Sequence, residues 1–160
     1  MSNTNIVILA ILSVAISASV LYFANVDPKA NPEVQKEYTD GLFILNINNK
    51  TIELEVADTD DKREKGLSNH ESLKKDTGML FVFDKPDKYG FWMENMKFSI
   101  DILWLNEQKE IIYVAENVSP DSYPDVFFPP EDSLYALEFN AGFVDENNIE
   151  VGNVLNFSEK

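Results

Sequence analysis

Apolar residues follow two different patterns along this chain. Residues 6–24 form an uninterrupted apolar run without a charged side chain, whereas from residue 41 onward short apolar segments alternate with polar turns. At a rise of about 1.5 Å per residue, a helix over the run would be roughly 28 Å long, close to the thickness of the bilayer hydrocarbon. The pattern predicts an N-terminal transmembrane anchor at residues 1–24 and one globular domain at residues 41–160.

Two features of the N-terminal segment favour an uncleaved anchor over a signal peptide. The first five residues carry no Lys or Arg, and the small residues Ser17, Ala18 and Ser19 lie inside the apolar run instead of after it. We therefore expect an anchor that stays attached, with a cleaved signal peptide as the alternative. Residues 25–40 contain prolines and many charges without an apolar period, which is typical of a flexible linker.

The orientation of the anchor rests on a weaker signal. Lys29 and Lys36 follow the apolar run and no basic residue precedes it, so charge counting alone would place the domain in the cytoplasm. These lysines lie among acidic residues, however, and short N-terminal anchors on small domains most often serve export. We expect the domain outside the cytoplasm, attached to the membrane through residues 6–24. Secretion after signal cleavage is the alternative.

Within the domain, short segments of alternating or wholly apolar residues predict strands. Residues 43–47 and 52–56 alternate on either side of Asn48 and Asn49, which indicates a β-hairpin. Residues 98–105 and 111–118 carry apolar side chains on both faces, so both are expected in the middle of the sheet. The other predicted strands are residues 77–83, 90–95 and 134–140, and residues 149–157 are expected to close the domain as a turn and a strand.

Two short helices complete the predicted fold. Asp58 or Thr59 is expected to cap a helix over residues 60–65 that ends at Gly66, and residues 141–147 are a second candidate. Many short strands with two short helices indicate an α+β fold. We expect a single compact domain with a mostly antiparallel, barrel-like sheet.

The charge balance restricts the expected partners. The chain has 13 basic and 28 acidic residues and a net charge of -15. Such a surface repels phosphate, so nucleic acid is not an expected partner. The chain has no cysteine and one histidine, His70, which excludes disulfides, thiol nucleophiles and a three-histidine zinc site. No cofactor, metal site or catalytic residue is predicted.

Polar residues placed among large apolar ones mark the candidate site. Asp101 lies between two isoleucines on a predicted strand, and a buried carboxylate has to be hydrogen-bonded, paired or protonated. Aromatic rings beside fixed polar groups are suited to a small polar ligand such as a sugar. The candidate binding residues are Trp92, Asn95, Asp101, Glu116, Asn117, Tyr123 and Glu138, the last expected opposite the apolar face of its strand. Arg63, the single arginine, is the candidate for a structural ion pair.

Several short motifs follow one another in an order typical of one protein family. They include Arg63-x-x-Gly66-Leu67, Gly78-Met79-Leu80-Phe81, Phe91-Trp92-Met93-x-Asn95, Asp101-Ile102-Leu103 and Tyr135-x-Leu137-Glu138-x-x-Ala141-Gly142. Over roughly residues 52–157 the chain resembles the uncharacterised family known as domain of unknown function 192. The resemblance implies the family's architecture and frequent export or membrane attachment, but no reaction. Glu94 and Met96 stand where members commonly have Lys and Thr, so we expect Glu94 to be exposed.

Three functions compete at this point. The favoured one is a non-catalytic binding or accessory module in the cell envelope that holds a small polar ligand. The second is a hydrolase with two paired carboxylates, Asp101 with Glu116 or Glu138, because such chemistry needs two carboxyl groups close together. The third is a structural module in which Phe127 and Phe128 dock an envelope protein.

Overall fold

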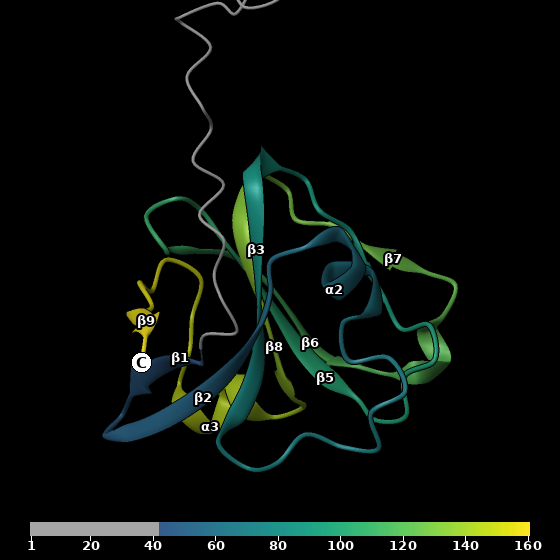
Figure 1. Ribbon diagram of the computed structural model, residues 1–160, viewed down its shortest axis with the longest axis horizontal. Helices are drawn as coiled ribbons and strands as arrows, with labels where there is room; N and C mark the ends of the chain where they lie inside the picture. Colours follow the sequence, from purple (N-terminus) through teal and green to yellow (C-terminus); the bar gives the residue numbers. More distant parts are fainter. Residues whose placement is uncertain (1–41) are drawn as a thin grey trace, which may run out of the picture. The chain divides into compact units, whose positions relative to one another are not determined.

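The computed structural model describes residues 42–160 (Figure 1), and the predicted anchor of residues 1–24 and linker of residues 25–40 lie outside this part. Within residues 42–160, no helix is long and apolar enough to cross a membrane. The elements are, in chain order, β1 (Phe43–Ile47), β2 (Lys50–Ala57), α2 (Asp60–Lys65), β3 (Thr77–Asp87), β4 (Phe91–Trp92), β5 (Ile100–Leu105), β6 (Ile111–Val118), the 3-10 helix η1 (Pro120–Ser122), β7 (Val126–Phe127), β8 (Ser133–Asn140), α3 (Phe143–Asn147) and β9 (Phe157–Glu159).

Seven of these strands form one sheet in the order β6-β5-β8-β3-β2-β1-β9, and β4 pairs with β7 in a separate two-stranded ribbon. Every neighbouring pair in the large sheet is antiparallel except β2 and β3, which are parallel. The single sheet-rich domain with two short helices is therefore confirmed.

The prediction of a barrel-like sheet is wrong, because the sheet does not close. The C-terminal segment reaches both edges: Ile111 N donates to Asn153 O beside β6, and β9 then pairs with β1. At β6 this contact amounts to one isolated bridge, Glu110 with Val154, instead of a strand ladder. The two edges are thus linked by an irregular segment, and the sheet stays open.

Local chemistry explains the first hairpin and the first helix. Asn48 and Asn49 both have left-handed backbones, with φ of 48° and 61°, as a two-residue hairpin turn requires. Thr59 precedes α2 and accepts a hydrogen bond from Lys62 N, and Gly66 ends the helix with φ of 46°. Both elements are predicted correctly from the sequence.

The large sheet is covered on both faces, and β5 shows this most clearly because all six of its residues are buried. Leu103 and Leu105 face a first core, which α3 and residues 149–157 cover. Ile102 and Trp104 face a second core, covered by Leu67, Leu73 and the β4–β7 ribbon. The prediction that both strands lie in the middle of the sheet is wrong in its detail: β5 is an interior strand next to the edge, and β6 is the edge strand.

We expect the two tryptophans to differ sharply in their effect on stability. Trp104 is fully buried and its Nε1 donates to Tyr89 O at 2.8 Å, whereas Trp92 is 44% exposed. Replacing Trp104 with Phe removes packed volume and leaves that carbonyl unpaired, so the free energy of unfolding should fall by about 1–3 kcal/mol. Urea denaturation of the detergent-solubilised chain, followed by circular dichroism, measures the change.

The matched control is Trp92→Phe, which should change the free energy of unfolding by less than about 0.5 kcal/mol. Equal losses in the two variants would contradict the assignment of Trp104 to the core.

Candidate functional site

The β4–β7 ribbon carries large apolar side chains on its outer side. Four of them are exposed: Trp92 (44%), Tyr123 (49%), Val126 (44%) and Phe128 (57%). We call these four residues the aromatic surface. Large apolar side chains that are exposed next to one another are uncommon on the surface of a domain and mark interaction sites.

Specific contacts hold the aromatic surface together. Trp92 is directly opposite Val126 across the ribbon, so their side chains lie on the same side. Phe128 and Val126 both lie against Gly90, where an added Cβ would come within 2.5 Å of the Phe128 ring. Gly90 therefore has no room for a side chain. Tyr123 Oη lies 3.4 Å from Glu94 Oε1. Because Glu94 is two positions after Trp92, the Tyr123 ring lies close to the end of β4.

The inner side of the ribbon attaches it to the second core. Phe91 is buried between Phe81 and Trp104, with ring centroids 4.8 Å and 5.5 Å away in edge-to-face geometry. Phe127 packs against the same core from β7. Because alternate residues of a strand point to opposite sides, fixing Phe91 inside fixes Trp92 outside. The aromatic surface is thus presented on a packed support.

The segment that carries Tyr123, Val126 and Phe128 has charges of one sign only. Residues 119–132 contain Asp121, Asp125, Glu131 and Asp132 and no basic residue, and all four acidic side chains are exposed. Glu94 adds an exposed carboxylate from the β4 side, as expected from the sequence. The apolar centre therefore has an acidic rim on this side, whereas Lys88, two residues before Gly90, is an exposed cation on the β4 side. The acidic side complements a surface with basic residues.

Asp101 lies elsewhere and has a different environment. Its side chain is fully buried on the first-core face, where Oδ1 accepts from Asn117 N at 2.8 Å and Oδ2 accepts from Val144 N at 3.0 Å. The carboxylate therefore connects β5 to the end of β6 and to the first turn of α3. Both oxygens are engaged with the backbone, so its observed contacts are structural.

Glu138 is buried on the opposite face of the sheet. It lies between Met79 on β3 and Ile102 on β5, and both of these side chains belong to the second core. It does point away from Leu137 and Phe139, as expected, but the face it points to is also covered. Within residues 42–160, Glu138 Oε2 and His70 Nδ1 are the buried side-chain atoms without a hydrogen-bond partner. Burial raises the pKa of the Glu138 carboxyl from 4.5 to about 8.

The remaining predicted residues are dispersed. Asn95 and Asn117 are exposed and have left-handed backbones, with φ of 57° and 53°, and Glu116 is exposed on β6. Arg63 forms ion pairs with Asp60 at 2.6 Å and with Asp84 at 3.8 Å. Its Nη1 also donates to Asp58 O and Val82 O, so this side chain connects α2 to β3.

Of the predicted residues, only Trp92, Asn95 and Tyr123 lie in or next to the aromatic surface. Asp101 and Glu138 are on opposite faces of the sheet and do not form a carboxylate pair. Val126 was not among the predicted binding residues. It is brought to Trp92 by the pairing of β4 with β7, and strands of two residues that lie about 35 positions apart leave no periodic signal in the sequence. The run of aromatics and prolines at residues 123–130 was the only visible indication of this surface.

Comparison with known proteins places this fold in a family. Residues 43–157 match the model of the family DUF192, described as "Uncharacterized ACR", and the chain belongs to this family. No protein among the curated ones matches significantly.

Two solved structures are similar to this chain. A crystal structure of a proposed transcription regulator from Sinorhizobium meliloti 1021 is 26% identical, with a TM-score of 0.66, over 76% of this chain and 95% of that one. A crystal structure of a protein of unknown function from Novosphingobium aromaticivorans DSM 12444 is 24% identical, with a TM-score of 0.64, over 72% of this chain and 83% of that one. The second supports the fold alone.

Removing the Asp101 carboxylate should destabilise the domain without affecting its surface. Asp101→Ala leaves the amides of Asn117 and Val144 unpaired, and the free energy of unfolding should fall by about 2–4 kcal/mol. Asp125→Ala, which removes an exposed carboxylate, is the control and should change it by less than about 0.5 kcal/mol. Urea denaturation measures both, and similar values would show that the two hydrogen bonds of Asp101 are unimportant.

Glu138 should make the domain less stable as the pH rises. The unfolded carboxyl releases its proton near pH 4.5, whereas the folded one keeps it up to about pH 8. Between these values the unfolded state binds fewer protons, so the free energy of unfolding falls by up to about 1.4 kcal/mol per pH unit. The stabilisation is complete below pH 4.5 and is lost by pH 8.

The variant Glu138→Gln cannot titrate and should lack this contribution. Relative to the unchanged chain, it should gain stability on the order of 3 kcal/mol between pH 5 and pH 8, measured by urea denaturation at both values. All other carboxylates are common to the two proteins, so the difference isolates Glu138. Parallel pH profiles would refute the raised pKa.

Proposed function

We propose that this chain is a non-catalytic binding module that docks a partner protein through the aromatic surface. The observation that carries the proposal is the presence of four large exposed apolar side chains on the β4–β7 ribbon and the residues beside it, with Trp92 opposite Val126 and Phe128 next to Val126 on Gly90. Interfaces between proteins are enriched in Trp, Tyr and Phe at their centres, and such residues provide most of the binding energy.

The surroundings of the aromatic surface indicate the chemistry of the partner. The acidic side chains of Glu94, Asp121 and Asp125 are exposed and no basic residue occurs in residues 119–132. A partner with apolar residues flanked by Lys or Arg would bury the rings and complement the rim. The overall net charge of -15 would also attract such a partner at long range.

The support beneath the surface favours docking without rearrangement. Phe91 and Phe127 pack into the second core, and the Phe81–Phe91–Trp104 series of edge-to-face contacts fixes β4. A side chain that is already ordered loses little conformational freedom on binding, so more of the contact energy appears as affinity.

We place this module at the membrane, with residues 6–24 as the anchor and the domain outside the cytoplasm. The support is the uncharged apolar run and the linker-like composition of residues 25–40. The regulatory role suggested for the Sinorhizobium meliloti protein is not adopted for this chain, because a net charge of -15 opposes approach to nucleic acid phosphates. Paired-carboxylate hydrolysis is not proposed either. Asp101 and Glu138 lie on opposite faces of the sheet, and both Asp101 oxygens accept backbone N–H bonds, so Asp101 has a structural role whether its partner is taken as Glu138 or as Glu116.

A photo-crosslinking experiment in native membranes tests the proposal. A photoreactive phenylalanine analogue replaces Phe128 in the full chain, and after irradiation the adducts are separated by size and identified by mass spectrometry. We expect a discrete adduct with a protein that carries basic residues beside the crosslinked segment. The adduct should weaken at least about tenfold when Trp92 is also changed to Ala, because Trp residues at interface centres contribute 1.4 kcal/mol or more.

The matched control places the same analogue at Val151, which is also highly exposed (59%) but lies far along the chain from the ribbon. Position 151 should give no discrete adduct. The same adduct from both positions, or none from position 128, would overturn the docking proposal.

A further inference from the structure

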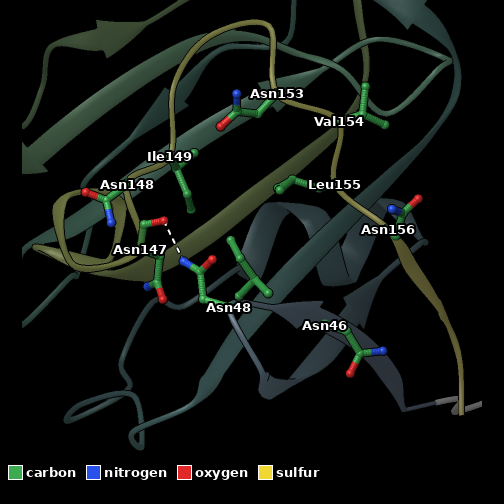
Figure 2. A pocket seen from close by; sticks show the side chains of 10 residues that line it. Asn46, Asn48, Asn147, Asn148, Ile149, Asn153, Val154, Leu155 and Asn156 are labelled. Atoms are coloured by element: carbon green, nitrogen blue, oxygen red, sulfur yellow. Dashed lines mark hydrogen bonds between the residues drawn. The ribbon is translucent and has the colours of Figure 1, made fainter.

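A second candidate site lies on the other side of the sheet, away from the aromatic surface. A pocket of about 330 Å³ is lined by three segments: the β1–β2 turn, the end of α3 and residues 153–156. Figure 2 shows Ile149 and Leu155 near its middle, with Asn147 and Asn148 at one end and Asn46 and Asn156 at the other. Both apolar residues belong to the first core. The volume is at the lower end of the range for small-molecule sites.

The polar lining of the pocket consists of amides. Six asparagines line it, and no charged side chain does: they are Asn46, Asn48, Asn147, Asn148, Asn153 and Asn156. Each amide group carries two donors and an acceptor, so the pocket offers both kinds of partner in a small volume.

Backbone geometry explains only some of these asparagines. Asn48 and Asn148 have φ of 48° and 52°, a conformation that asparagine tolerates better than most residues. Asn46, Asn147 and Asn156 do not have positive φ. Turn chemistry is therefore not a sufficient reason for the composition of the pocket.

The hydrogen bonds divide the amides into fixed and available ones. Asn147 is fixed, since its Nδ2 donates to Phe143 O at 2.8 Å and its Oδ1 accepts from Lys50 Nζ at 3.2 Å. Asn48 Nδ2 donates to Asn147 O at 2.8 Å, which ties the β1–β2 turn to α3. Within residues 42–160, the side chains of Asn148 and Asn156 make no hydrogen bond. Their amides are available to a ligand.

The absence of charge from this lining selects the class of ligand. A bound cation would lack a carboxylate partner in the lining and would lie near the Lys50 ammonium, which donates to Asn147 Oδ1. A bound anion would find no charged group in the lining itself and would enter a protein with a net charge of -15. Desolvating either charge without a partner is costly. A hydroxyl group, in contrast, both donates and accepts, which matches an amide lining. The C–H face of a sugar ring can pack on Ile47, a half-buried aliphatic residue of the lining.

We propose that this pocket binds a neutral sugar. Asn148 and Asn156 hydrogen-bond its hydroxyl groups, and Ile47 contacts its apolar face. The site is independent of the proposed partner surface, because the pocket adjoins the first core and the aromatic surface adjoins the second.

Saturation-transfer NMR on the full chain, in a detergent without a sugar headgroup, tests this proposal. The probes are glucose, mannose, N-acetylglucosamine and myo-inositol, with glucuronate and glucosamine as charged comparators. At least one neutral probe should show saturable transfer, and both charged probes should show much weaker transfer at the same concentration.

The test variant is the double substitution Asn148→Gly with Asn156→Ala. Glycine retains the left-handed backbone at position 148, and neither side chain makes a hydrogen bond, so the fold should be unaffected, as checked by thermal melting. Sugar affinity should fall by about tenfold or more, because two amide contacts are lost. The matched control is Asn69→Gly, an exposed asparagine with φ of 66° in another loop, which should bind as the unchanged chain does.

Three results would overturn the sugar site: no transfer to any neutral probe, equal transfer to the charged probes, or unchanged affinity in the double variant. Trp92→Ala separates this proposal from the partner surface, because it should weaken partner crosslinking and leave sugar binding intact.

Discussion

The burial of β5 on both faces obliges the chain to cover the large sheet twice. Leu103 and Leu105 require one apolar layer, and Ile102 and Trp104 require another. The first layer comes from α3 and the C-terminal segment, and the second from the loop around Leu67 and the β4–β7 ribbon. Each covering layer also creates a surface: the asparagine pocket forms at the edge of the first, and the aromatic surface forms on the outside of the second.

The two buried carboxylates show how differently one sheet can accommodate a polar group. Asp101 accepts two backbone N–H bonds, which satisfy both of its oxygens and join three elements. Glu138 has an unpartnered oxygen between Met79 and Ile102, so burial favours its neutral form and raises its pKa to about 8. Asp101 thus contributes to the architecture, whereas Glu138 introduces a dependence of stability on pH.

Local patterns predicted the elements well, and the long-range arrangement less well. The hairpin at Asn48 and Asn49 and the helix after Thr59 follow from turn and capping chemistry, which depends on neighbours in the sequence. The barrel-like closure was wrong because closure depends on whether β6 and β9 pair, and the intervening segment forms only one bridge there. The aromatic surface and the pocket both combine segments that are distant in the sequence. The recurrence of asparagine at residues 46–49, 147–148 and 153–156 was visible, but nothing in their spacing brings them together.

Strand alternation couples the fold of this protein to the surface that we propose for docking. Phe91 must enter the second core to contact Phe81 and Trp104, and Trp92 must therefore face outward. The same holds on β7, where Phe127 packs inward, whereas Val126 on β7 and Phe128 directly after it do not. Small polar residues at positions 92, 126 and 128 would still allow the core of the domain to pack. Because large apolar ones occupy all three, at a cost in exposed apolar area, packing of the domain alone does not account for them. The partner that we propose would cover them.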